Sequence, residues 1–197
     1  MTVASSIQTL LNPAAAWPLL ILAILLLDVI VLFVCRYYLP PAHPLNTWYD
    51  KYGILAVAAD VASIAIGFAV ARYLFNTFFR SSGLIGFLLL LVGFQALHDI
   101  FFYLFVILPI PRGVNGLMDI FKDYARVSGA LIIPGDSGLM LGSAALFVLL
   151  SQLPIQGQIF AALVTVYTLP YILTTNSRVA QKKKIQLLYK EETLPKE

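Results

Sequence analysis

Residues 17–39 read WPLLILAILLLDVIVLFVCRYYL, a run in which only Asp28 and Arg36 carry a charge. A helix that crosses the hydrocarbon core of a bilayer needs about 20 mostly apolar residues. Four further runs have this length and character, at about residues 54–75, 84–110, 130–153 and 156–174. The sequence therefore predicts an all-α integral membrane protein, with a bundle of five transmembrane helices inside residues 1–177.

Composition supports the same class. Of the 197 residues, 60% are hydrophobic and 12% are charged, and the mean hydropathy is +0.86. A soluble domain carries about 25% charged residues, and a soluble core of this length could not hide so much apolar surface. The single Cys35 excludes an internal disulfide and a cysteine-based zinc site, and we expect it to be buried.

The distribution of Lys and Arg predicts the orientation. With five spans, every Lys and Arg except Arg72 and Arg80 falls on one side of the membrane. The positive-inside rule makes this the cytosol-like side, with the basic tail at residues 178–197 on it and the N-terminus opposite. We expect Lys182, Lys183 and Lys184 to set this topology and to contact anionic lipid. The net charge of +3 is thus a property of the tail, and it predicts lipid and not nucleic acid as the partner.

The segment NGLMDIFKDYARVS at about residues 115–128 has an amphipathic pattern. Leu117, Phe121 and Tyr124 fall on one helical face, and the charged residues fall largely elsewhere. Asn115 is suited to cap the start of such a helix. The pattern predicts an interfacial helix on the cytosol-like side, acting either as an elbow between spans or as a docking surface for a partner.

Aromatic residues near the predicted span ends fit an interfacial belt. We place in this belt Trp17, Tyr37, Tyr38, Trp48, Tyr49, Tyr52 and Tyr73. His43, in a loop between prolines, is expected to face solvent.

Each of the first four spans contains one aspartate: Asp28, Asp60, Asp99 and Asp136. With a helical rise of about 1.5 Å per residue, the second and fourth of these lie roughly 10 Å from the cytosolic ends of their spans, and the first and third roughly 16 Å. His98 precedes Asp99, and Gln95 lies one turn before both. If the four helices form a bundle, the aspartates are expected to meet in one layer.

An aspartate that is charged at the bilayer centre costs about 2.5–3.5 kcal/mol on insertion scales, and one distant Arg72 cannot neutralise four of them. The aspartates are therefore protonated, hydrogen-bonded to polar neighbours, or holding a cation. As a function, the pattern indicates polar contacts that join helices, a proton or small-cation path with His98 as a relay, or an enzyme or pigment site. No cofactor is assigned. Adjacent helical residues point about 100° apart, so His98 and Asp99 do not predict a metal site.

Small residues in the fourth span predict close helix packing. Gly138 and Gly142 are four residues apart, and Gly135 lies near the same face. Such residues let helix backbones approach one another. The contact is either within the chain or with another copy or another membrane subunit.

Two stretches, HDIFFYLFVILPIPRGVNGLMDIFKDYA at residues 98–125 and GALIIPGDSGLM at residues 129–140, resemble uncharacterised multi-pass membrane proteins encoded by large DNA viruses of algae and other protists. Residues 45–64 extend the similarity to about a third of the chain. The resemblance implies a location, namely a viral membrane or the host membrane that supplies it, and it implies no catalytic residue.

The chain contains no phosphate-binding glycine loop, no H-E-x-x-H and no G-x-S-x-G. We therefore expect a non-enzymatic structural or assembly component of a membrane, viral or otherwise. The first alternative is a small cation or proton pathway through the aspartates. The second is an accessory subunit of an organellar membrane complex.

Overall fold

In the computed structural model, which describes residues 2–12, 14–177 and 179, every regular element is a helix. The all-α class predicted from the sequence is therefore confirmed. The α-helices are α1 (Val3–Leu11), α2 (Trp17–Tyr38), α3 (Pro44–Tyr52), α4 (Ile54–Leu74), α5 (Gly83–Phe102), α6 (Gly116–Ser128), α7 (Ile132–Ser151) and α8 (Ile155–Leu173). The basic residues Lys182, Lys183 and Lys184 lie outside the described residues.

Four continuous helical segments in the described part of the chain are long and apolar enough to cross a membrane. They are Trp17–Tyr38, Ile54–Ile107, Gly116–Ser151 and Ile155–Leu173. This corrects the expectation of five separate helices. The loop expected between the second and third runs is instead helical, with π-helical turns at Phe75–Phe79 and a 3-10 turn at Arg80–Ser82. α4 and α5 therefore belong to one unbroken 54-residue segment.

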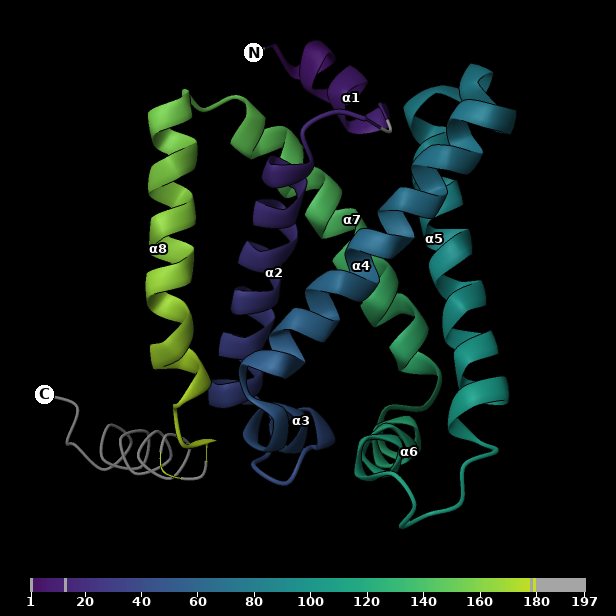
Figure 1. Cartoon of the computed structure of the whole chain (residues 1–197), viewed down its shortest axis with the longest axis vertical. Coiled ribbons are helices and arrows are strands. Elements are labelled where there is room, and N and C mark those ends of the chain that lie inside the picture. Colours follow the sequence, from purple (N-terminus) through teal and green to yellow (C-terminus); the bar gives the residue numbers. More distant parts are fainter. Residues whose placement is uncertain (1, 13, 178, 180–197) are drawn as a thin grey trace, which may run out of the picture.

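The direction of the chain nevertheless reverses inside this segment. Figure 1 shows α4 rising across the molecule and α5 descending beside it, and the two helices pack against each other. Gly83 lies at the start of α5 with φ of +64°, a conformation that favours glycine. The turn is therefore built from tightened helical turns and one glycine, which leave no extended loop to be recognised in the sequence.

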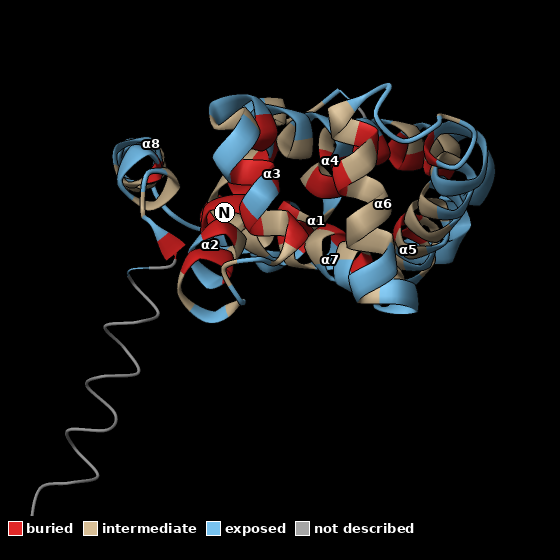
Figure 2. Ribbon diagram, turned by 90° about the horizontal axis from the view of Figure 1, so that it is seen from below, coloured by how far each residue is buried: buried red, intermediate tan, exposed pale blue. Residues whose placement is uncertain are grey.

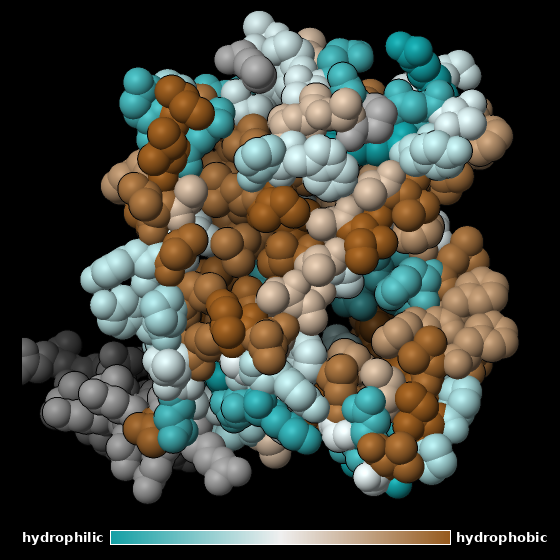
Figure 3. Space-filling view, viewed as in Figure 1, coloured by the Kyte–Doolittle hydropathy of each residue, from teal (hydrophilic) through white to brown (hydrophobic). Residues whose placement is uncertain are grey.

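The long helices form a bundle around α2. This helix packs against α4, α7 and α8, while α5 packs against α4 and α7. α8 lies at one edge of the bundle and is mostly exposed (Figure 2). Hydrophobic residues cover the middle of the face in Figure 3, and hydrophilic residues gather towards its two ends, as expected for a protein in a bilayer.

Short helices close both ends of the bundle. α1 lies across the end that contains the N-terminus, and α3 and α6 lie together at the opposite end (Figure 1). The helix expected near residues 115–128 is present, and the Asn115 side chain accepts hydrogen bonds from the backbone N–H groups of Leu117 and Met118 at 2.9 and 3.4 Å. α1 and α3 were not predicted from the sequence.

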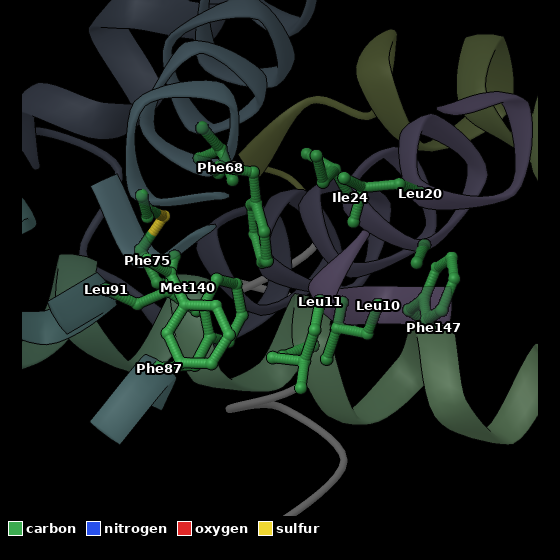
Figure 4. Packing of buried hydrophobic residues seen from close by; sticks show 14 of the residues in the cluster. Leu10, Leu11, Leu20, Ile24, Phe68, Phe75, Phe87, Leu91, Met140 and Phe147 are labelled. Atoms are coloured by element: carbon green, nitrogen blue, oxygen red, sulfur yellow. The ribbon is translucent and has the colours of Figure 1, made fainter. Parts of the chain in front are cut away.

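Two groups of buried apolar residues fill the bundle. The larger group, which we call the upper core, joins α1 to the adjoining halves of α2, α4, α5 and α7. Figure 4 labels its main members: Leu10, Leu11, Leu20, Ile24, Phe68, Phe75, Phe87, Leu91, Met140 and Phe147. The second group lies nearer the other end and includes Cys35, which is buried as expected, together with Trp48 and Tyr49.

Candidate functional site

Asp28 and Asp60 meet through a tyrosine from the short helix α3. The Tyr49 hydroxyl lies 3.4 Å from Asp28 Oδ1 and 3.2 Å from Asp60 Oδ2. The Asp28 side chain is buried, with 3% of the residue exposed, and so is Tyr49. Residues from α2, α3 and α4 are therefore joined at one point inside the bundle.

Asp60 receives a second hydrogen bond from the same helix. Trp48 Nε1 donates to Asp60 Oδ2 at 3.1 Å. The Trp48 ring is buried and packs against Phe121 of α6, with ring centroids 5.4 Å apart. Trp48 and Tyr49 thus point into the protein, which corrects their expected place in an interfacial belt.

The local sequence explains how α3 is held in position. Pro44 is suited to the first turn of a helix, and the His43 side chain caps it by accepting from the Leu45 N–H at 3.3 Å. We expected His43 to face solvent, but it is partly buried. Gly53, with φ of +54°, then ends α3 and starts α4. Pro44 therefore begins the helix that supplies Tyr49.

On α5, Asp99 is the centre of a local hydrogen-bonded group. Gln95 Nε2 donates to Asp99 Oδ1 at 2.7 Å, across the one-turn spacing noted in the sequence. His98 Nδ1 lies 3.3 Å from the same oxygen. The His98 side chain is 44% exposed, whereas that of Asp99 is 12% exposed. This group therefore connects a buried carboxyl to an accessible imidazole.

Asp136 on α7 lies between the two groups. Its charge interacts with those of Asp99 and Asp60, and Asp60 in turn interacts with Asp28. The four aspartates that the sequence suggested, one each from α2, α4, α5 and α7, are therefore neighbours in a series that runs from Asp28 through Asp60 and Asp136 to Asp99. We call these four residues the acid cluster.

Basic side chains are engaged elsewhere. Arg36 is buried and its Nη1 lies 2.6 Å from Asp50 Oδ1, while its Nη2 donates to the Leu173 carbonyl at 2.9 Å. Arg72, at the other end of the bundle, donates to the carbonyls of Leu10 and Ala15. In the described residues, the ion pairs of Lys and Arg go to Asp50 and Asp123, and none reaches the acid cluster.

Some polar atoms in the cluster have no hydrogen-bond partner. Asp28 Oδ2 and Asp99 Oδ2 are buried without one, and so is the Ser137 hydroxyl beside Asp136. Ser63 donates to the Asp60 backbone carbonyl and not to its carboxylate. Burial of an unpaired carboxylate oxygen is costly unless the group is neutral or a ligand completes its contacts.

The two tyrosines that approach the cluster from outside the spanning helices remain protonated. Burial, followed by the nearby charges of Asp28 and Asp60, raises the pKa of Tyr49 far above its usual range. Burial, followed by the charge of Asp136, raises the pKa of Tyr124 on α6 to about 12. Both hydroxyls are therefore hydrogen-bond donors at any physiological pH.

The acid cluster is partly accessible, and the interior between it and α1 is closed. Asp60, Asp99 and Asp136 are partly exposed, and Figure 3 shows hydrophilic side chains in a hollow between α4 and α5. Between the cluster and α1, the interior is filled by the upper core (Figure 4). A polar group that reaches Asp28 therefore meets packed apolar side chains on the far side.

The glycines of α7 divide into two kinds. A Cβ atom on Gly142 would lie 2.8 Å from Leu27 Cδ2, so this glycine permits the close approach of α2 and α7. Gly135 and Gly138 face open space, with no heavy atom within 4 Å of a Cβ placed there. Of the three glycines for which close helix packing was predicted, only Gly142 packs against another helix of the described chain.

In the described residues, no group of three or more His, Cys, Asp or Glu side chains is arranged to hold a metal ion. A hollow of about 350 Å³ near the end of α8 is lined by Asp50 and residues 174–177, and none of the four aspartates lines it.

The residues that sequence reasoning missed are Trp48 and Tyr49. The sequence places them in an interfacial belt, because aromatic residues near a span end are typical of one. The i,i+1 pair on a nine-residue helix carries no periodic signal. An interior role could have been suspected only from the aspartates that need donors.

No protein-family model, no curated protein and no solved structure matches the chain. The fold and the site therefore define a class only. The class is that of all-α proteins with helices suited to a bilayer, here with four acidic side chains inside the bundle.

Proposed function

We propose that this protein takes up and releases protons, or small cations in their place, at the acid cluster inside a membrane. One observation carries the proposal: four carboxyl groups from four helices interact electrostatically, with no Lys or Arg of the described residues paired to them. Charges buried in hydrocarbon must be paired or neutralised. Protons supply that neutralisation, and they can leave again where the site is accessible.

The proposal includes five crossings of the membrane, with the C-terminus on the cytosol-like side. The reversal between α4 and α5 supports this count, because two packed helices of about 20 residues each match the thickness of a bilayer. The distribution of Lys and Arg supports the orientation. On this topology, the acid cluster lies in the half of the bundle nearer the cytosol-like side, and the upper core fills the opposite half.

Proton uptake tests the proposal directly. The purified protein is given a small pH step in weakly buffered solution that contains a pH-sensitive dye, which reports the protons bound, and Asp60→Asn and Asp99→Asn variants are compared with the native chain. Asp119→Asn is the matched control, because it makes the same chemical change at a partly exposed position of α6, outside the cluster. We expect the native chain and the control to take up protons as the pH falls, and both cluster variants to take up fewer.

A second candidate is the structural or assembly component that the sequence favoured, in a viral membrane or as a subunit of an organellar complex. The open Gly135 and Gly138 positions support it, because they leave a small-residue surface on α7 free for another helix. If both cluster variants take up as many protons as the native chain and Gly138→Leu weakens self-association or partner binding, this second function replaces the first.

A further inference from the structure

Tyr49 has one hydroxyl hydrogen but contacts two carboxyl groups. It lies within hydrogen-bonding distance of Asp28 Oδ1 and Asp60 Oδ2, at 3.4 and 3.2 Å. A hydroxyl donates one hydrogen bond and accepts up to two. If Tyr49 donates to one carboxyl, the contact with the other requires that this second carboxyl carries a hydrogen of its own.

The contacts of Asp60 decide which carboxyl is ionised. Asp60 Oδ2 faces two donors, the Trp48 Nε1–H at 3.1 Å and the Tyr49 hydroxyl. An ionised carboxylate only accepts, and two donors on one oxygen suit it. Asp28, by contrast, is 3% exposed and its Oδ2 has no partner. The neutral form costs less there, because no donor stabilises a charge on that oxygen.

From this geometry we propose that Tyr49 is a proton relay between Asp28, which carries the proton, and Asp60, which is ionised. The inference rests on the proposed function and identifies the path inside the acid cluster. In one step, the Asp28 O–H bond breaks as its proton passes to the Tyr49 oxygen, and the original Tyr49 O–H bond breaks as that proton passes to Asp60. The tyrosine ends as it began, and the negative charge has moved from Asp60 to Asp28.

The other ionisable groups around Asp28 in the described chain do not hydrogen-bond to its carboxyl. Cys35 and Arg36 lie on its own helix, and Arg36 is held by Asp50. From α7, Asp136 interacts with Asp60 and Asp99. From α8, the described ionisable side chains are Tyr167 and Tyr171, which are exposed and bond to each other. Among the described residues, the only hydrogen-bond partner found for the Asp28 carboxyl is Tyr49.

Infrared spectroscopy of the protein in lipid tests the inference. A protonated carboxyl has a carbonyl band distinct from that of a carboxylate. We expect one such band that disappears in Asp28→Asn and persists in Asp60→Asn. We also expect that Tyr49→Phe slows hydrogen–deuterium exchange of this band on the order of 100-fold, the size of effect typical of a lost proton-transfer group. Tyr52→Phe, the same change one turn further along α3, leaves the exchange rate unchanged.

Two results overturn the relay. The first is a band that disappears in Asp60→Asn and persists in Asp28→Asn, which would place the proton on the other side of Tyr49. The second is exchange at the native rate in Tyr49→Phe. If Tyr49→Phe does not fold, the band assignment from the two aspartate variants still decides the position of the proton. The infrared assay is independent of the uptake measurement, so native-like proton uptake in both cluster variants together with the expected band pattern would reject the proposed function alone.

Discussion

Arg36 shows how one residue joins parts of the chain that are distant in sequence. Its guanidinium is 1% exposed and contacts Asp50 at the end of α3 and the backbone of Leu173 at the end of α8. Asn46, also buried, donates to the Cys35 and Pro40 carbonyls beside it. A buried guanidinium without an anion is costly, so Asp50 matters although it lies largely at the surface.

We expect Asp50→Asn to lower the free energy of unfolding by about 1–3 kcal/mol, because the buried guanidinium loses its charged partner but keeps an acceptor of the same shape. Thermal unfolding in detergent measures the effect. Asp119→Asn serves again as the control and should change the same quantity by less, because Asp119 accepts from the Gly113 N–H, which an asparagine oxygen also does. Equal effects in the two variants would contradict the role given to the Arg36–Asp50 pair.

His43 makes a pH-dependent contribution at the start of α3. Its Nδ1 accepts from the Leu45 N–H, which only an unprotonated nitrogen can do. Partial burial lowers the pKa of His43 below its usual 6.5. The unfolded chain therefore takes up the proton first, so this stability is fully present above pH 6.5 and is lost as the pH falls through that value.

We expect the melting temperature of the native chain to fall more steeply between about pH 8 and pH 5 than that of His43→Asn. Asparagine is a good helix cap that does not titrate in this range, so the variant removes the proton and keeps the cap. Parallel pH profiles for the two proteins would show that His43 does not contribute.

At the scale of the elements, α1 is held by side chains of α4 and of the π-helical turn that follows it. Arg72 Nε donates to the Leu10 carbonyl at 2.7 Å, and Asn76 Nδ2 donates to the Leu11 carbonyl at 2.8 Å. These are carbonyls of the last turn of α1, which have no partner within their own helix. Arg72 also stacks on the Trp17 ring, 5.0 Å from its centroid. Arg72 therefore caps the C-terminal end of α1.

We expect Asn76→Ala to detach α1 more often, at a cost of about 1 kcal/mol for the lost hydrogen bond. Hydrogen exchange should speed up in residues 3–11 and stay unchanged in α7. Thr77→Ala is the control, because Thr77 bonds to the Tyr73 carbonyl of its own helix. Faster exchange across the whole bundle would mean instead that α1 and the bundle unfold together.

The sequence was informative where the signal is local. Apolar runs of about 20 residues located the long helices, and the i,i+4 spacing of Gln95 and Asp99 correctly suggested their contact. The short helices α1 and α3 were missed because nine residues carry too little periodicity. The turn at Phe75–Ser82 was misjudged because π-helical and 3-10 turns use the same residues as an α-helix. Tyr49 reaches Asp28 only through tertiary packing, which no spacing rule predicts.

The whole molecule has a polar end and an apolar end inside the same bundle. The acid cluster lies in the half that α3 and α6 cover, and the upper core fills the half that α1 covers. Whether these halves face opposite sides of the membrane depends on the number of crossings. This number can be measured without any assay of function.

Single cysteines placed at exposed positions should separate into two sets in a Cys35→Ala background. With five crossings, cysteines at Ser5, Ser81 and Gln152 react with an impermeant reagent from one side of the membrane. Cysteines at Ala42 and Val114 react from the other. If Ser5 and Ser81 label from different sides, α4 and α5 do not cross as a pair and the topology is wrong.

The closed upper core has an electrical consequence. On the proposed function and topology, a proton that moves from the cytosol-like side to Asp28 would travel roughly 16 Å by helical rise and stop there, about half of the way through a hydrocarbon core of about 30 Å. It would therefore cross about half of the transmembrane voltage, which amounts to roughly 1 kcal/mol for each 100 mV. A voltage that is negative on the cytosol-like side would draw the proton away from Asp28. Loss of that voltage would let Asp28 take up a proton again. The protonation of Asp28 would then depend on the transmembrane voltage and report it.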